Sequence, residues 1–195
     1  MKSKIQSLIL TGAAVLAASC FDVGKKDLPR PRPESSPIAA ASASPATEKK
    51  TVSFDDALAA YKSKDLDRAE AGFKEVAASE PKNADAHFYL GKIRSDRNDA
   101  AGSIEHFREA SRLDPKSVEK LMALGDAYFA VRQFDVAIVH YGKIPGFEPE
   151  NADAYYKMGR TYIALGNKIA VRQQIRKLEQ VNKSLADKLS KELGE

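Results

Sequence analysis

Three segments of eleven residues repeat one pattern along the chain: PKNADAHFYLG at 81–91, PKSVEKLMALG at 115–125 and PENADAYYKMG at 149–159. Each begins with a proline, and the spacing from one proline to the next is constant. The third residue is Asn83, Ser117 or Asn151, whose side-chain oxygen can accept a hydrogen bond at a helix N-terminus. The fifth is Asp or Glu, which the helix dipole favours in a first turn. The pattern therefore predicts three helices that begin shortly after these prolines.

A second helix is predicted after each segment. Each segment ends in Leu-Gly or Met-Gly, and a small or branched residue lies twelve positions after the glycine, with a bulky one four positions further on. The small or branched residues are Ser103, Ala137 and Val171, and the bulky ones are Phe107, Tyr141 and Ile175. A spacing of four places both residues on one helix face. Each repeating unit is therefore predicted to contain two helices.

This pattern resembles the tetratricopeptide repeat (TPR), a helix-turn-helix unit of about 34 residues with small residues where its helices cross. The resemblance implies an all-α protein, a right-handed superhelical solenoid of about four helix-turn-helix repeats that together form a concave groove. It implies close helix approach at Gly91, Gly125 and Gly159, and it implies that Phe73, Phe107 and Tyr141 fill the gap beside the next repeat. The expected units are repeats at 51–83, 84–117, 118–151 and 152–183, and a capping helix at 184–195.

The sequence departs from the repeat in two places. The first unit lacks Leu-Gly in its first helix, but an apolar face at helical spacing remains, formed by Phe54, Ala57, Leu58 and Tyr61. In the third unit Pro145-Gly146 interrupts the second helix, which we expect to end about a turn early because proline donates no backbone hydrogen bond. The capping helix is expected to start at Ser184 as its N-cap, and Leu185, Leu189 and Leu193 would cover the last repeat.

Composition excludes several classes of protein. The 195 residues are 43% hydrophobic and 30% charged, which is typical of a single soluble domain rather than a polytopic membrane protein. One cysteine permits neither an intrachain disulfide nor a thiolate zinc site. The net charge of +4 comes from the chain ends, since residues 51–167 carry 16 Lys and Arg against 19 Asp and Glu. The folded part therefore lacks the basic stripe of a nucleic-acid-binding protein.

Residues 1–19 are expected to be a lipoprotein signal peptide. Lys2 and Lys4 precede an apolar stretch at 8–18, which is too short to stay in a membrane as a spanning helix. The sequence LAASC at 16–20 resembles a bacterial lipobox, although it has Ala17 where that motif usually has leucine. The resemblance implies that Cys20 is acylated and becomes the first residue of the mature chain. The alternative is ordinary cleavage after Ser19, which leaves a free thiol.

Residues 20–50 are expected to be a disordered linker behind the lipidated Cys20. The segment is rich in Pro, Ala and Ser and has few large apolar residues, so it cannot bury enough surface to offset its ordering entropy. Its alternating PRPRP core favours extended polyproline II. We interpret the segment as a spacer from a membrane anchor, and a ligand for an SH3-type domain is the alternative.

The sequence contains no pattern of catalysis, cofactor binding or metal binding. The histidines are His87, His106 and His140, and the last two share one repeat position, so they recur along the chain rather than converge on a metal. We expect that position to be solvated. No glycine-rich phosphate loop follows a strand. The protein is therefore predicted not to be an enzyme and to need no cofactor.

The TPR resemblance implies a binding surface on the first helix of each repeat. Its second, fifth, ninth, twelfth and thirteenth positions line the concave groove in that family. In the second repeat these are Asp85, Phe88, Lys92, Ser95 and Asp96. In the third they are Glu119, Met122, Asp126, Phe129 and Ala130. In the fourth they are Asp153, Tyr156, Arg160, Ile163 and Ala164.

The groove would hold the apolar side chains of Phe88, Met122, Phe129, Tyr156 and Ile163 among charged residues, which suits an amphipathic helix or an extended apolar peptide. The Lys/Asn clamp that chaperone adaptors of the family use for a peptide carboxylate is not reproduced. The alternative is that the aromatic residues are covered by their own neighbours. The groove hypothesis predicts that Phe88→Ala with Tyr156→Ala abolishes partner capture and leaves helicity and melting unchanged.

The combined pattern is similar to that of bacterial TPR lipoproteins. It implies an adaptor, lipid-anchored at the bacterial cell envelope and at the outer membrane facing the periplasm, which binds an envelope protein or peptide and helps to assemble a membrane complex of the secretion, pilus or outer-membrane assembly type. One alternative is a scaffold or accessory subunit for cell-wall-processing enzymes. A weaker one is a self-associating structural protein, a homo-oligomer. No nucleic-acid partner is expected.

Overall fold

The computed structural model describes residues 52–194, in which the chain forms nine α-helices, one short 3-10 helix and no strand. The expected signal peptide, Cys20 and the linker lie outside the described residues. The α-helices are α1 (Phe54–Lys62), α2 (Leu66–Ser79), α3 (Ala84–Asp96), α4 (Ala100–Leu113), α5 (Val118–Ala130), α6 (Phe134–Tyr141), α7 (Ala152–Ala164), α8 (Lys168–Val181) and α9 (Lys183–Leu193), and the 3-10 helix is η1 (Ile144–Gly146). None of these helices is both long and apolar enough to cross a membrane.

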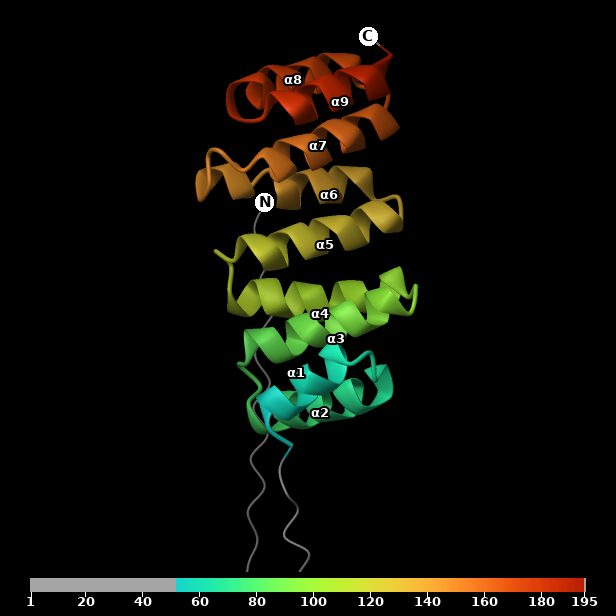
Figure 1. Ribbon diagram of the computed structural model, residues 1–195, viewed down its shortest axis with the longest axis vertical. Helices are drawn as coiled ribbons and strands as arrows, with labels where there is room; N and C mark the ends of the chain where they lie inside the picture. The colour runs from blue at the N-terminus through green and yellow to red at the C-terminus, as the bar shows by residue number, and fades with distance from the viewer. Residues whose placement is uncertain (1–51, 195) are drawn as a thin grey trace, which may run out of the picture. The chain divides into compact units, whose positions relative to one another are not determined.

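The helices pack in chain order as four antiparallel pairs with α9 at the end (Figure 1). Within this unit α1 packs on α2, α3 on α4, α5 on α6 and α7 on α8, and each pair also contacts the next. The first helices of the last three pairs begin at residues 84, 118 and 152, which repeats the constant spacing of the prolines. The predicted all-α solenoid of about four helix-turn-helix repeats is confirmed.

Each of these three helices begins at the predicted N-cap. The side-chain oxygen of Asn83 accepts a hydrogen bond from the backbone nitrogen of Ala86 at 3.0 Å, and Asn151 does the same for Ala154 at 2.9 Å. Ser117 caps α5 in the same way. Such a cap contributes about 1 kcal/mol to helix stability, so the start of each repeat is fixed by a local interaction as well as by packing.

The small residues of the repeat lie where helices approach one another. A Cβ atom on Gly91 would overlap the ring of Phe107, and one on Gly125 would overlap the ring of Tyr141. Both rings are almost fully buried, at 3% and 1% exposed. Phe107 and Tyr141 also belong to the apolar cluster that continues into the following repeats, so the prediction that they fill the gap beside the next repeat is confirmed. At Gly159 the neighbour that fills this space is Leu189 of α9.

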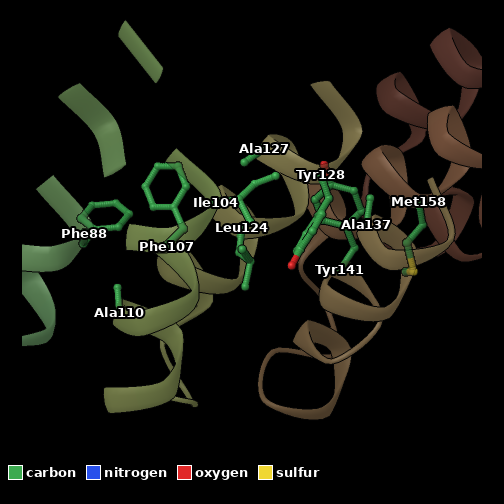
Figure 2. Packing of buried hydrophobic residues seen from close by; sticks show 10 residues of the cluster. All are labelled: Phe88, Ile104, Phe107, Ala110, Leu124, Ala127, Tyr128, Ala137, Tyr141 and Met158. Carbon is green, nitrogen blue, oxygen red and sulfur yellow. The ribbon is translucent and has the colours of Figure 1, made fainter. Parts of the chain in front are cut away.

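One apolar cluster runs from α3 to α7 and joins three repeats (Figure 2). Figure 2 shows the rings of Phe88 and Phe107 side by side, and their centroids are 5.8 Å apart. The other buried members of the cluster are Ile104, Ala110, Leu124, Ala127, Tyr128, Ala137, Tyr141 and Met158. Because no repeat could bury this face alone, the stacking of neighbours completes the core.

The second helix of the third repeat is short, as predicted. Helix α6 has eight residues, whereas α4 and α8 have fourteen each. It ends at Tyr141, and Pro145 then lies in the 3-10 helix η1. This helix still buries Ile144, which packs with Leu121 and Ala154. The interruption therefore shortens the helix without opening the core at this point.

The capping helix exists, but its predicted start is wrong. Helix α9 begins at Lys183 and is capped by Asn182, whose side-chain oxygen accepts from the backbone nitrogen of Leu185 at 3.1 Å. Asn182 has the extended backbone of a cap residue and also ends α8, so Ser184 falls inside the first turn. Leu189 is fully buried and packs with α8 residues against the last repeat.

Candidate functional site

The first helices of repeats two and three border a pocket of about 630 Å³ on the face where the sequence places the groove. Nine of the predicted groove residues line it: Phe88, Lys92, Ser95, Asp96, Glu119, Met122, Asp126, Ala130 and Asp153. The predicted residues that do not line it are Asp85, Phe129, Tyr156, Arg160, Ile163 and Ala164. The pocket therefore belongs mainly to α3 and α5.

The floor of the pocket is apolar. Met122 and Ala123 are half-buried on α5, Ala127 is buried, and Ala130 is exposed at the end of the same helix. Residues at these spacings lie along one helix face. The pocket thus offers a narrow apolar strip on which aliphatic side chains could pack.

Phe88 belongs to the core more than to the surface. Its ring is 3% exposed and packs against Tyr89 and Phe107, with centroid distances of 5.6 and 5.8 Å. The alternative that neighbours cover the groove aromatics therefore holds for this residue. The expectation that Phe88→Ala leaves melting unchanged is wrong, because the substitution would leave a cavity in the cluster that joins the repeats.

Lys92 lies at one end of the pocket above aromatic rings. Its Nζ atom is 5.4 Å from the ring centroid of Phe88 and 5.6 Å from those of Tyr61 and Tyr89. A cation in this position is attracted by the electron-rich ring faces. Tyr61 also donates a hydrogen bond to Asp96 at 2.8 Å, so the first repeat contributes to this end of the site. Burial raises the pKa of Tyr61, and the bond to Asp96 raises it further.

An ion pair that the sequence analysis missed joins repeats two and three. The Nζ atom of Lys120 is 2.7 Å from Asp85 and 3.2 Å from Asp114, and Lys120 is only 6% exposed. Burial lowers the pKa of Lys120, but the hydrogen bonds to both carboxylates outweigh that effect and raise it. The equivalent residues are Ala86 and Ala154, both fully buried. The sequence signal for this contact was a lysine at a repeat position that is alanine in the other two repeats.

Asp126 links the third repeat to the fourth. It accepts a hydrogen bond from the hydroxyl of Tyr141 at 2.7 Å and forms an ion pair with Lys157 at 2.6 Å. Burial raises the pKa of Tyr141, and the charge of Asp126 adds to that effect. This predicted groove residue therefore lines the pocket with its charge already balanced.

In repeat four three of the predicted groove residues, Tyr156, Arg160 and Ile163, contact α9 or the cluster that it forms with α8. The hydroxyl of Tyr156 donates to Glu192 at 2.6 Å, and Lys188 lies 4.9 Å from the centroid of its ring. Arg160 is 3.6 Å from the same glutamate. Ile163 packs with the apolar cluster of α8 and α9. The capping helix therefore covers this part of the predicted groove.

The histidine position is half-buried, so the expectation that it is solvated is wrong. His140 stacks on Tyr128 at 5.4 Å with an angle of 9° between the rings, and His106 lies 6.5 Å from His87. Burial lowers the pKa of both His106 and His140. These side chains turn toward the first helix of their own repeat. Within residues 52–194 no group of His, Cys, Asp or Glu is arranged to hold a metal ion.

Comparison with known families and structures extends this description. Residues 54–118 and 152–184 match family models described as tetratricopeptide repeat. The MamA protein is 25% identical, with a TM-score of 0.63 over 71% of this chain and 84% of that one. YrrB, described as "a TPR protein with an unusual peptide-binding site", is 18% identical, with a TM-score of 0.64 over 71% of this chain and 72% of that one.

A curated relative shares only part of its length with this chain. The protein CTR9 homolog of Arabidopsis thaliana is 28% identical over 121 residues, which are 59% of this chain and 11% of that protein. The chain thus spans about a tenth of this relative.

Proposed function

Because this chain contains tetratricopeptide repeats, we propose that it is an adaptor that binds a protein or peptide partner in the pocket between α3 and α5. The observation that carries the proposal is the pocket itself, which combines an apolar floor with a charged rim on the first-helix face of the repeats. A surface of this kind suits a helix or an extended segment of another protein. The similar fold of YrrB, described as having a peptide-binding site, supports the same use.

The same proposal gives the adaptor a place at the bacterial cell envelope. Cys20 would carry the lipid, residues 20–50 would act as a spacer, and the repeats would face the periplasm from the outer membrane. Two or three acyl chains anchor a protein durably, whereas one chain is marginal. In this setting the repeats would bring a partner to a membrane-associated assembly by binding rather than by catalysis.

A capture experiment tests the binding surface. The wild-type chain is crosslinked in intact envelopes, purified and analysed by mass spectrometry beside Ala130→Trp. Ala130 is exposed and lines the pocket, so a tryptophan there would fill the pocket without removing a core contact. Ala78→Trp is the matched control, since Ala78 is exposed on α2. We expect a component that wild type and Ala78→Trp capture and Ala130→Trp loses.

Identical profiles for all three chains would contradict the proposed surface. The nature of a specifically lost component would also decide the pathway, because a cell-wall-processing enzyme would favour the scaffold alternative over an assembly adaptor.

A labelling experiment tests the anchor. Cells that express the wild-type chain or Cys20→Ala are grown with radioactive palmitate, and the purified chain is counted and weighed by mass spectrometry. We expect label and a mass that begins at Cys20 with its acyl groups, both of which Cys20→Ala would lose. An unlabelled wild-type chain that begins at Cys20 with a free thiol would contradict lipid anchoring.

A further inference from the structure

The pocket between α3 and α5 has an unequal charge distribution. Its lining includes five carboxylates and one ammonium group. The carboxylates are Asp96, Glu119, Asp126, Glu148 and Asp153, and the ammonium group is that of Lys92. A partner that binds here must face this excess of negative charge.

Most of the carboxylates keep their charge unbalanced. Asp126 is paired with Lys157. Asp96 and Glu148 accept hydrogen bonds from neutral donors, the hydroxyl of Tyr61 and the amide of Asn151. Glu119 and Asp153 are exposed, and within the described part of the chain neither has an ion pair. Within residues 52–194, four of the five acidic side chains therefore have no ion pair.

Among the described residues that line the pocket, Lys92 is the one cation, and it does not offset these carboxylates. Lys92 is held at one end, above the rings of Phe88, Tyr61 and Tyr89. Glu119 and Asp153 lie in the first turns of α5 and α7, and Glu148 precedes α7, so three of the unpaired carboxylates belong to the part of the rim at these two helix starts. Asp96 lies one helical turn beyond Lys92 on α3.

A peptide carboxylate or an acidic segment would be repelled by this rim, whereas a cationic side chain would be attracted. The apolar floor formed by Met122, Ala123 and Ala127 would accept aliphatic side chains of the same segment. Alternate side chains of an extended peptide, or two faces of a helix, can present both kinds of group.

We infer that the pocket accepts a peptide segment that carries lysine or arginine beside aliphatic residues. This inference rests on the proposed function, since it names the chemistry of the partner for the same site. It also separates this groove from the cationic clamp of chaperone adaptors, which binds a carboxylate.

Selection from a random library of twelve-residue peptides on phage, with the purified full chain as bait, tests this inference. Enriched peptides are synthesised, and their binding is measured by fluorescence anisotropy at low and high salt. We expect enriched peptides to have a net positive charge with aliphatic residues, and their binding to weaken as salt screens the rim.

Charge variants separate the rim from the fold. Glu119→Gln with Asp153→Asn should weaken the binding of these peptides about tenfold, at the upper end of what two exposed charges contribute. Glu105→Gln with Glu179→Gln removes two exposed carboxylates elsewhere and should leave binding unchanged. Both variants keep every core residue.

The outcomes distinguish the two proposals. The inference would be overturned if the enriched peptides were neutral or acidic, or if they bound the Glu119/Asp153 variant as well as wild type. If such peptides nevertheless failed to bind Ala130→Trp, that result would still support the groove as the binding site. If no enriched peptide depended on Ala130, the proposed function would fail, and the inference with it.

Discussion

The first-helix face differs between the third repeat and the fourth. Met122 and Tyr156 occupy the same repeat position, yet Met122 forms the floor of a pocket, whereas Tyr156 is hydrogen-bonded to Glu192 of the capping helix. Asp126 and Arg160 differ in the same way, because the partner of Asp126 is in the next repeat and that of Arg160 is in α9. A repeat position therefore lines a pocket or forms an internal contact according to the element that follows it.

The largest expected loss of stability distinguishes a core residue of the pocket, Phe88, from a half-buried one, Met122. Phe88→Ala should lower the free energy of unfolding by about 3 to 5 kcal/mol, because it leaves a cavity in the apolar cluster. Met122→Ala, at the equivalent position of the next repeat, should cost about 1 to 2 kcal/mol, since Met122 is only half-buried. Urea unfolding followed by circular dichroism measures both. Equal losses would contradict the assignment of Phe88 to the core.

Removing the capping contact should have the next largest effect. Leu189→Ala should destabilise the protein by about 2 to 4 kcal/mol, because this side chain is fully buried beside Gly159. Lys191→Ala on the exposed side of α9 is the control and should change stability by less than about 0.5 kcal/mol. The same unfolding measurement applies. A Leu189 variant as stable as the control would mean that α9 is not a structural cap.

The ion pair at Lys120 should contribute less to the free energy of unfolding than the buried side chain of Leu189. Lys120→Met keeps the aliphatic stem but leaves Asp85 and Asp114 without their cation, which should cost about 1 to 2 kcal/mol. Lys116→Met, at an exposed residue of the preceding turn, should be neutral. Chemical denaturation of both variants checks this. A neutral Lys120→Met would show that packing alone joins repeats two and three.

The smallest effect concerns the contacts that cover repeat four. Glu192→Gln weakens exposed interactions with Tyr156 and Arg160 and should change stability by less than about 1 kcal/mol. Backbone NMR shifts should nevertheless move at these two residues and at α9. If no shift moved there, Glu192 would not hold α9 over this part of the face.

The fold was predictable because residues close together in the sequence specify the start, the cap and the crossing point of each helix. Evenly spaced prolines, the caps Asn83, Ser117 and Asn151, and the paired glycine and aromatic positions each specify one feature of a helix pair. Pro145 likewise predicted the short α6, since a missing backbone donor has the same effect in any context. These signals depend on near neighbours in the chain.

The site was predictable only in part, because burial depends on contacts between distant segments. The pattern that places Phe88, Met122 and Tyr156 in equivalent positions contains no information on which of them a neighbouring helix covers. The contact of Glu192 with Tyr156 spans 36 residues and depends on how α9 packs. His140 was misjudged for the same reason, since Tyr128 covers it.

Site-specific photocrosslinking can show whether partners bind between α3 and α5 and not over the covered face of repeat four. A photoreactive amino acid is placed in turn at Ser95, Ala130, Tyr156 and Ala78, and the full-length chain is irradiated in living cells. We expect one partner adduct from positions 95 and 130 and none from positions 156 and 78. The same adduct from position 156 or 78, with none from 95 and 130, would contradict it.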